Sequence, residues 1–298
     1  MALRLAEIDT LSCTRLSAPI VLAHGLFGFR RIGLGRFTLT SYFRGIPESL
    51  RAGGNRVVVT RVPPIAGLDL RARALAREID LAIPGQSFHL IGHSMGGLDA
   101  RRLLADPAWS ARCLSLTTVG TPHLGSALAD CARLKVGKVY QLLSAMRIDC
   151  RGFLDVTRQA ARSVNRNGQP PTRVPCFSVA GVLEAPEVCW PLKAFHEFLF
   201  EVEGPNDGLV SLESALGMGA PLPPWPIDHL RQMNWLPAPA GPSSSSAVFA
   251  LYASLVDNLA SLEFASRDVE PIDSRGVSAR RSGEVGQVAG RAGLFDRR

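Results

Sequence analysis

The chain has 298 residues, of which 46% are hydrophobic and 20% are charged. This composition is typical of a globular protein and excludes wholesale disorder, and a chain of this length buries enough surface to fold without disulfide or metal staples. No run approaches the ~20 apolar residues of a membrane-spanning helix. The formal net charge is +7, but the basic residues are scattered except near the carboxyl end and form no nucleic-acid-binding motif, so we expect no nucleic-acid partner.

The amino-terminal 18 residues interleave charged residues such as Arg4 and Asp9 with apolar ones. They contain no hydrophobic segment of the kind found in secretory signal peptides, which predicts a cytoplasmic protein. The six cysteines include no C-x₂-C pair, so zinc binding is not expected. Buried, reduced thiols are the simplest expectation for a cytosolic chain; in an exported one, Cys176 and Cys189 would be the first candidates for a disulfide.

Several short apolar runs, most with β-branched residues and bounded by glycine or proline, have the pattern of buried parallel strands. They are Pro19–Ala23, Arg56–Thr60, Phe88–Ile91, Leu114–Val119 and Cys176–Ala180. Helical patterns lie between them, among which Leu68–Ala82 has apolar residues at helical spacing. Alternating strands and helices predict an α/β fold with a mostly parallel central sheet flanked by helices, and such sheets carry their sites at the carboxyl ends of the strands.

From residue 127 to about 167 strand signals are few, and apolar residues between 139 and 146 recur at helical spacing. This segment predicts a helical insertion over the sheet, either a mobile lid or a helix packed on the core. Ser244–Leu262 predicts a final helix with a serine run at its start. We therefore expect one domain over residues 1–264, followed by a disordered basic tail over 265–298.

The sequence Gly92-His93-Ser94-Met95-Gly96 follows a predicted strand and precedes a helical run. A G-x-S-x-G sequence in this context is typical of a nucleophile elbow, in which the turn is so tight that side chains two residues before and after the serine would collide. The elbow exposes the Ser94 hydroxyl at the carboxyl edge of the sheet, and the helix start aims N–H groups at developing negative charge. A chance glycine-rich turn is the alternative, which the strand–turn–helix context disfavours.

A serine hydroxyl attacks an ester only when a base removes its proton, and the base in turn needs an acid to hold its tautomer. Of the six histidines, His229 lies late in the chain before the last helix, where α/β-hydrolases carry their base. The others lie in a strand, in the elbow, in loops after strands or in an apolar segment, where packing roles are expected. They are His24, His89, His93, His123 and His196.

The acid is expected between the serine and His229 in chain order. Asp207 stands in the turn sequence Asn206-Asp207-Gly208, after the strand-like Phe200–Val202. We take Asp207, 22 residues before His229, as the acid, and the alternative is a purely structural turn aspartate. Asp228 is the rival, but a residue adjacent to a histidine rarely points its carboxylate back at the imidazole.

An oxyanion hole requires two backbone N–H groups that point at the reacting carbonyl oxygen. One donor is expected from the residue after the nucleophile, Met95. The other is expected from a loop after an early strand, where His24-Gly25-Leu26 follows the first predicted strand and glycine lets the backbone approach a ligand. We therefore predict the Leu26 and Met95 amides as the two donors.

Several segments in one order resemble the bacterial true lipases of the Pseudomonas and Burkholderia type, an α/β-hydrolase family. The matching segments are residues 19–29, Tyr42-Phe43, Gly45-Ile46-Pro47, Ile91 to Arg102, Val119 to Ser126, Asn206–Val210 and Asp228-His229-Leu230. The resemblance implies an α/β-hydrolase fold with a helical lid, a triad of Ser94, Asp207 and His229, and oxyanion donors at Leu26 and Met95. It also implies hydrolysis of water-insoluble carboxylic esters, above all triacylglycerols.

Two features depart from that family. Its members usually carry a structural calcium ion whose ligands include an aspartate two residues after the catalytic histidine. Arg231 stands at that position, so we expect no calcium there and no other cofactor. Family members are also usually exported, whereas this chain shows no signal segment at its start.

These observations predict a serine carboxylic ester hydrolase, with triacylglycerols as the main substrate class and an acyl-enzyme intermediate. A short-chain carboxylesterase, an acyltransferase and a thioesterase would use the same triad, because the shape of the pocket selects the substrate and the acceptor. A non-catalytic lipid-binding scaffold would show a broken triad, and no break is visible. The expected partner is a lipid or another ester, with transient contact with a lipid surface and no transmembrane segment.

Overall fold

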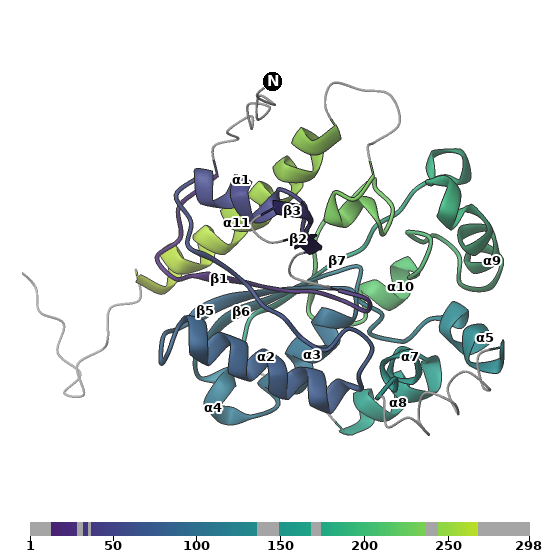
Figure 1. Cartoon of the computed structure of the whole chain (residues 1–298), viewed down its shortest axis with the longest axis horizontal. Coiled ribbons are helices and arrows are strands. Elements are labelled where there is room, and N and C mark those ends of the chain that lie inside the picture. Colours follow the sequence, from purple (N-terminus) through teal and green to yellow (C-terminus); the bar gives the residue numbers. More distant parts are fainter. Residues whose placement is uncertain are drawn as a thin grey trace, which may run out of the picture.

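The computed structural model describes residues 13–28, 32–34, 37–135, 149–167, 174–236 and 244–267. Its centre is a parallel sheet flanked by helices (Figure 1). The strands of this sheet are β1 (Ile20–Ala23), β4 (Val57–Val59), β5 (Phe88–His93), β6 (Cys113–Val119), β7 (Cys176–Val179) and β8 (Ala220–Pro221). The predicted α/β fold is confirmed.

The order of the strands in space is β4-β1-β5-β6-β7-β8. The chain therefore adds β4 on one side of β1 and all later strands on the other side. The direction of winding reverses between β1 and β5, and open α/β sheets bind their ligands outside the carboxyl ends of the strands at such a point. The segments that follow β1 and β5 begin at His24 and Ser94, so this topology brings the predicted oxyanion loop beside the predicted nucleophile.

All five predicted strands are confirmed, with small shifts at their ends. The largest shift is in β5, which continues beyond the apolar run through Gly92 and His93, because both residues still pair with β6. Two features were not predicted: the two-residue strand β8, and an antiparallel pair outside the main sheet, formed by β2 (Ile32–Leu34) and β3 (Phe37–Thr40).

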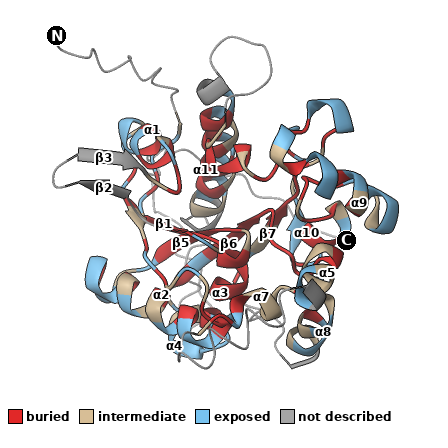
Figure 2. Ribbon diagram, turned by 45° about the vertical axis from the view of Figure 1, so that its right-hand side comes forward, coloured by how far each residue is buried: buried red, intermediate tan, exposed pale blue. Residues whose placement is uncertain are grey.

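Alternate residues of the strands enter two hydrophobic cores, one on each face of the sheet, as expected for strands covered on both sides. Ile20 and Leu22 of β1 pack in the core under α1 (Ile46–Ala52) and α11 (Ser244–Arg267). Val21 and Ala23 pack in the other core, under α2 (Leu68–Ala82) and α3 (Met95–Leu104). Figure 2 shows the central strands β1, β5, β6 and β7 largely buried and the outer faces of the helices exposed.

The remaining helices lie beyond the carboxyl ends of the strands and beside α3 (Figure 1). They are α4 (Pro107–Ser110), α5 (Ala127–Lys135), α7 (Gly152–Asp155), α8 (Arg158–Asn167), α9 (Lys193–Glu203), α10 (Leu212–Ala215) and the 3₁₀ turns η1 (Ala185–Glu187), η2 (Trp190–Leu192) and η3 (Arg231–Met233). The helices α5, α7 and α8 occupy the range predicted as a helical insertion. The apolar residues between 139 and 146, on which the lid hypothesis depends, lie outside the described residues.

Two boundaries differ from the sequence prediction. Phe200–Val202, predicted as extended, belongs to helix α9, because His196 and Leu199 are buried at helical spacing and three residues of apolar–polar alternation are too few to specify a strand. Helix α11 continues through Arg267 and so passes the predicted domain end at residue 264. Residues 268–298 of the predicted tail lie outside the described residues.

Helix α11 is long and apolar enough over Ala247–Phe264 to cross a membrane by length and composition. Its apolar stripe, however, packs in the core against the sheet, where Tyr252, Val256 and Leu259 are almost completely buried. This burial is typical of the core helix of a globular domain. Among the described residues no other helix is long and apolar enough to span a membrane.

Glu263 ties the end of α11 to the start of the sheet. Its carboxylate accepts hydrogen bonds from Ser17 N (2.8 Å), Ser17 Oγ (2.7 Å) and Ala18 N (3.1 Å), and it pairs with His89 Nε2 at 3.0 Å. Burial by itself would raise the pKa of this carboxyl, but the hydrogen bonds outweigh burial and lower the pKa from 4.5 to about 2. Because the pKa is lower in the folded state, the carboxylate stabilises the fold above pH 4.5, and this contribution is lost as the pH falls towards 2.

The Glu263→Gln variant should therefore lower the free energy of unfolding at pH 7 by about 1–3 kcal/mol, since it weakens hydrogen bonds to a charged acceptor. The difference from the wild type should shrink as the pH is lowered below 4.5. Urea unfolding at pH 7 and at pH values below 4.5 measures both effects. Glu197→Gln, on the exposed side of α9, is the matched control, and a Glu263→Gln deficit that does not change with pH would contradict the assignment.

Candidate active site

Ser94 connects β5 to α3 in a strained turn. Its φ of 54° and ψ of −130° lie in a region that residues with a side chain rarely adopt. A Cβ at Gly92 would lie 2.7 Å from Gly97 Cα, and a Cβ at Gly96 would meet the Ala23 carbonyl at the end of β1. The two glycines are therefore required by close backbone approach, as the elbow motif predicts.

The strained turn is held in place from the neighbouring strand. The Ser94 amide donates to the Val119 carbonyl at 2.9 Å, and the Thr121 hydroxyl donates to the Ser94 carbonyl at 2.8 Å. These bonds satisfy the N–H and C=O groups of Ser94, which lies between the end of β5 and the start of α3. Ser94 itself is half-buried and directly follows the carboxyl end of β5.

Asp207 and His229 form a buried pair, with 2.8 Å between Asp207 Oδ2 and His229 Nδ1. The turn after α9 fixes the carboxylate, because its Oδ1 accepts from the Leu209 and Val210 amides at 3.0 and 2.8 Å. The His229 amide also donates to the Asp207 carbonyl at 2.9 Å, which locks the two loops together. The acceptor at Nδ1 leaves Nε2 of His229 as the nitrogen able to take a proton from a substrate or nucleophile.

The His229 ring lies beside the elbow, 4.7 Å from the ring of His93, the residue before Ser94 (centroid to centroid). Within the described residues, hydrogen bonds join His229 to Asp207 but do not join the Ser94 hydroxyl to the imidazole. Such catalytic hydrogen bonds are often long in the absence of substrate and tighten in the complex. The structure thus brings Ser94, Asp207 and His229 to one edge of the sheet, although 135 residues separate the first from the last.

The two amides predicted for the oxyanion hole are available. The loop after β1 lies against the nucleophile, since a Cβ at Gly25 would stand 3.1 Å from Ser94 Oγ. Within the described residues, neither the Leu26 amide nor the Met95 amide donates to another backbone group. Met95 is also the first residue of α3, where the helix dipole favours negative charge.

The oxyanion loop is held from below by Arg71, a side chain that the sequence analysis did not single out. Its guanidinium forms a fully buried ion pair with Asp99 at 2.7 Å and donates to the carbonyls of His24 and Gly25 at 2.8 and 3.2 Å. Because the Gly25 carbonyl and the Leu26 amide belong to the same planar peptide unit, Arg71 fixes the orientation of that donor. Arg71 lies on the buried face of α2. The sequence pattern of this helix shows only that its apolar residues recur at helical spacing, and it does not show that an arginine among them has a functional role.

Asp228, the rival acid, has other partners. Its carboxylate pairs with the Arg231 guanidinium and accepts from the Leu230 and Arg231 amides at 3.1 and 3.0 Å. Arg231 also donates to the Glu187 carbonyl at 2.8 Å. Asp228 therefore shapes the turn that carries His229 and does not orient the imidazole.

The calcium site implied by the resemblance does not fit these residues. A guanidinium stands where the family has an aspartate ligand, and it forms an ion pair with Asp228. Within the described residues, no three or more histidine, cysteine, aspartate or glutamate side chains cluster as metal ligands would. The Arg231 guanidinium itself links the His229 turn to the loop at Glu187, because it donates a hydrogen bond to the Glu187 carbonyl.

The five histidines assigned to packing are all buried. The ring of His24 receives the Val62 amide at 3.3 Å, and burial lowers its pKa from 6.5 to about 4. His123 contacts Thr118 and Arg101, and burial together with that arginine holds its pKa well below 6.5. All six cysteines are free thiols, so Cys176 and Cys189 form no disulfide, and three of the six are only partly buried.

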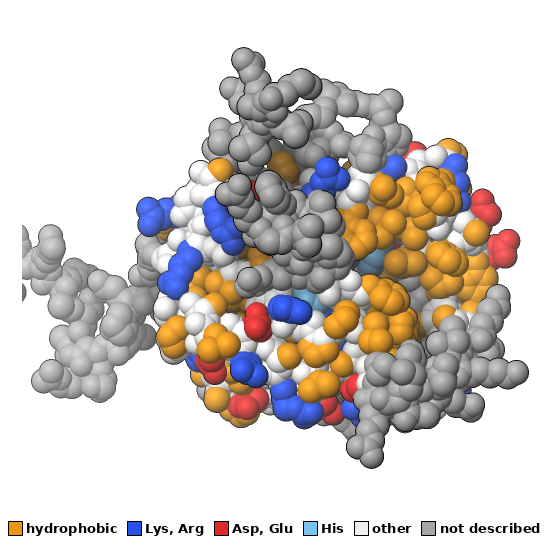
Figure 3. All heavy atoms as spheres, viewed as in Figure 1, with side chains coloured by type: hydrophobic (Ala, Val, Ile, Leu, Met, Phe, Trp, Pro, Cys, Tyr) orange, Lys and Arg blue, Asp and Glu red, His pale blue; other side chains and the backbone are white. Residues whose placement is uncertain are grey.

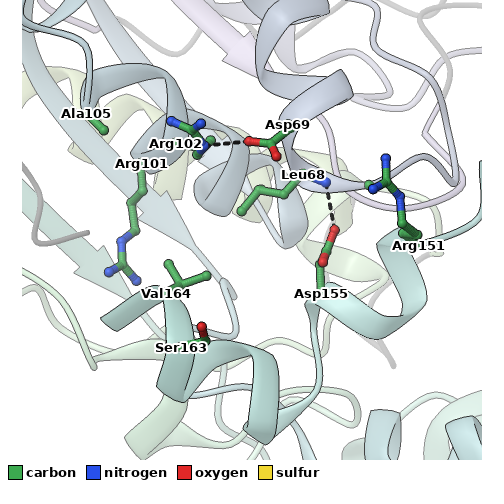
Figure 4. A pocket seen from close by; sticks show the side chains of 10 residues that line it. Leu68, Asp69, Arg101, Arg102, Ala105, Arg151, Asp155, Ser163 and Val164 are labelled. Atoms are coloured by element: carbon green, nitrogen blue, oxygen red, sulfur yellow. Dashed lines mark hydrogen bonds and ion pairs between the residues drawn. The ribbon is translucent and has the colours of Figure 1, made fainter. Parts of the chain in front are cut away.

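A surface pocket of about 550 Å³ lies between α2, α3 and α8 (Figure 4). Its charged groups are largely paired within the protein: Arg102 Nε lies 2.6 Å from Asp69 Oδ1, and Asp155 accepts the Leu68 amide at 2.7 Å. Ser94, Asp207 and His229 do not line it. The pocket is therefore separate from the candidate active site.

Comparison with known proteins supports the fold and the resemblance. Residues 69–160 match the alpha/beta hydrolase fold family. Triacylglycerol lipase 2 of Saccharomyces cerevisiae is 31% identical over 211 residues, which cover 65% of this chain and 62% of the yeast protein. A triacylglycerol lipase of Vibrio cholerae is 38% identical over 125 residues, 40% of this chain and 37% of that protein. The chain thus spans less than two thirds of the length of these relatives.

Among solved structures, Staphylococcus hyicus lipase superposes with a TM-score of 0.68 at 18% identity, covering 84% of this chain and 97% of that one. This match concerns the fold. The similarity to lipases expected from the motifs is confirmed by the sequence matches. The strand order, the nucleophile elbow and these matches together show that the chain has the α/β-hydrolase fold and is similar to lipases.

Proposed function

We propose that the protein is a serine carboxylic ester hydrolase that cleaves acylglycerols through an acyl-enzyme on Ser94. The observation that carries the proposal is the joint placement of a strained, half-buried serine, a buried Asp207–His229 pair and two amides that have no backbone partner in the described part of the chain. Triacylglycerol lipase is also the printed name of the relatives from yeast and Vibrio cholerae.

The reaction follows from these positions. His229 Nε2 takes the proton of the Ser94 hydroxyl as its oxygen attacks the ester carbonyl carbon, and the Leu26 and Met95 amides hold the resulting oxyanion. The tetrahedral species then breaks its bond to the alcohol, which leaves with the proton from His229. Water repeats the sequence on the acyl-enzyme and releases the carboxylic acid, while Asp207 holds the Nδ1 proton of His229 and stabilises the imidazolium.

The substrate class is tested by a chain-length series of p-nitrophenyl esters beside triolein, with a matched thioester and with added alcohol as a competing acceptor. We expect hydrolysis of esters, including triolein, with free acid as the main product. Preferred cleavage of the thioester would assign a thioesterase, and preferred transfer to the alcohol would assign an acyltransferase. Hydrolysis of only the shortest esters in the series would assign a short-chain esterase.

The surface near α9 fits contact with a lipid aggregate. Trp190 is 83% exposed, and Phe195, Phe200 and Val202 are also exposed on or beside this helix. Figure 3 shows hydrophobic side chains gathered over the region of α9 and α10. Exposed apolar patches of this kind mark binding surfaces, so we propose transient contact of this face with the lipid substrate.

The Arg231–Asp228 pair supports activity without calcium. Adding EDTA, or EDTA followed by excess CaCl₂, should leave both kcat and the unfolding midpoint unchanged, because Arg231 already supplies the positive charge beside Asp228. Initial rates on a soluble p-nitrophenyl ester and thermal unfolding measure the two quantities. A loss of activity in EDTA that calcium restores would contradict the proposal.

A further inference from the structure

A chain of buried hydrogen bonds runs from the candidate oxyanion loop to the candidate triad acid. The Gly25 amide donates to Tyr42 Oη at 3.1 Å, and Tyr42 Oη lies 2.8 Å from His93 Nδ1. His93 Nε2 lies 2.9 Å from Gln232 Oε1. Gln232 Nε2 donates to Asp207 Oδ2 at 2.9 Å, the same oxygen that His229 contacts.

Only one placement of protons satisfies this chain. The Asp207 carboxylate is an acceptor, so Gln232 presents its NH₂ group to Asp207 and its carbonyl to His93. His93 must then carry its proton on Nε2 and accept at Nδ1 from the Tyr42 hydroxyl. The oxygen of Tyr42 in turn accepts from the Gly25 amide.

Electrostatics favour the same arrangement. Burial, followed by the neighbouring His229, holds the pKa of His93 well below 6.5, so His93 stays neutral with a single ring proton. Burial also raises the pKa of Tyr42 above its usual value of 10, so Tyr42 keeps its proton. Each bond in the chain therefore has a defined direction.

The chain is shielded from water, and the Gln232 amide is clamped in place. Gln232, His93 and Asp207 have no exposed surface, and Tyr42 is 2% exposed. A Cβ at Gly120 would overlap Gln232 Oε1, and a Cβ at Gly181 would overlap Gln232 Nε2. The glycines after β6 and β7 thus make room for the Gln232 amide. Because the site is buried, a polar group left without its hydrogen bond would lower the stability of this arrangement.

We propose that Gln232 is a positioning residue, which through His93 and Tyr42 couples the Asp207 carboxylate to the backbone of the oxyanion loop. The residues of this hydrogen-bond chain come from five separate segments. They are the loop after β1, the segment after β3, the end of β5, the turn after α9 that carries Asp207, and the η3 turn three residues beyond His229. Gln232 supplies Asp207 Oδ2 with a second donor, which keeps the carboxylate from rotating away from His229. This inference rests on the proposed ester hydrolysis.

The decisive variants are Gln232→Leu and Gln232→Glu. Gln232→Leu removes both bonds of the amide and should lower kcat by about 10- to 100-fold with little change in KM, because small misplacements of catalytic groups cost rates of this size. The titratable groups that face the amide are Asp207 and His93, with His229 beside them. In Gln232→Glu, the introduced carboxyl reproduces both bonds only while it is protonated.

The two variants therefore differ in their pH dependence. Two carboxyls that share a buried site hold a proton to unusually high pH, so Gln232→Glu should approach the wild-type kcat at low pH and fall behind it as the pH rises. For Gln232→Leu the ratio to the wild type should not depend on pH. A purely structural role would lower the amount of folded enzyme and leave the pH profile of kcat as it is in the wild type.

Coupling along the chain is measured with a double-mutant cycle. Tyr42→Phe breaks the other end of the chain. Within the described residues His93 lies between Tyr42 and Gln232 and no hydrogen bond joins the two directly, so independent effects on kcat would multiply. We expect the loss of kcat in the double variant Tyr42→Phe/Gln232→Leu to be clearly smaller than the product of the two single-variant losses of kcat. Gln86→Leu, which removes a surface amide bonded to Arg56, is the matched control and should leave kcat unchanged.

The experiment separates failure of this inference from failure of the proposed function. Fluorophosphonate labelling of Ser94 needs an activated serine but no ester substrate, so its rate and pH profile report on the same chain. A wild type that labels but does not hydrolyse esters would refute the ester assignment alone. A pH profile of Gln232→Glu that matches the wild type would overturn the role of Gln232, and so would multiplicative losses of kcat in the double variant. If Gln232→Leu does not fold, the pH profile of Gln232→Glu alone decides.

Discussion

Replacing Ser94 by alanine should lower kcat for ester hydrolysis by about 10⁴- to 10⁶-fold, because the covalent step loses its nucleophile. The fold should persist: the side chain is only half-buried, and the bonds that hold the turn involve the Ser94 backbone. Initial rates on a p-nitrophenyl ester and urea unfolding measure the two effects. We expect the free energy of unfolding to change by less than about 1 kcal/mol.

The matched control for this variant is Ser110→Ala, which removes a hydroxyl at the end of α4, bonded to the Pro107 carbonyl. It should hydrolyse esters at the wild-type rate. Rapid turnover by Ser94→Ala would refute a serine acyl-enzyme. A variant that is inactive because it is unfolded would be recognised from its urea transition, so loss of chemistry and loss of structure are separated.

The Asp207→Asn variant should lower kcat by about 10⁴-fold while KM changes little, because an asparagine can donate to His229 Nδ1 and so favour the wrong tautomer. The backbone bond from the His229 amide to the Asp207 carbonyl remains, and it keeps the two loops together. Rates measured from pH 6 to 9 test this prediction.

Asp228→Asn distinguishes the two candidate acids. This change weakens the buried pair with Arg231 and should cost about 3–5 kcal/mol of stability. Its kcat per folded molecule should remain within about tenfold of the wild type, since Asp228 does not contact the imidazole. A larger loss of kcat in Asp228→Asn than in Asp207→Asn would reverse the assignment of the acid.

The fold was predictable because its strands are short, continuous apolar runs separated by amphipathic helices. A continuous apolar run is typical of a strand that is covered on both faces of the sheet. Phe88–Ile91 is such a run, and it is buried on both faces. The ends of elements were less predictable. Gly92 and His93 extend β5 because β6 offers them backbone partners, and Phe200–Val202 is helical because its neighbours bury one face of α9.

The candidate site was predictable where a local backbone requirement marks it. The glycines around Ser94 are needed by the turn itself, and the turn sequence at Asp207 provides the amides that fix its carboxylate. Arg71 and Gln232 were missed for a common reason. Each acts through contacts with segments far away in the chain, and neither is surrounded by a pattern that distinguishes it from an ordinary helix or turn residue.

Hydrophobic periodicity was enough to predict the α/β architecture, and local sterics were enough to predict the elbow at Ser94. Asp207 and His229 were predicted from the order in which triad residues follow one another along the chain. The choice between Asp207 and Asp228 as the partner of the imidazole needed the folded chain, and so did the finding that Arg231 pairs with Asp228. The same holds for the buried chain from Gly25 to Asp207. Hydrogen bonds between loops depend on how the strands are ordered in the sheet, and that order is a property of the whole fold.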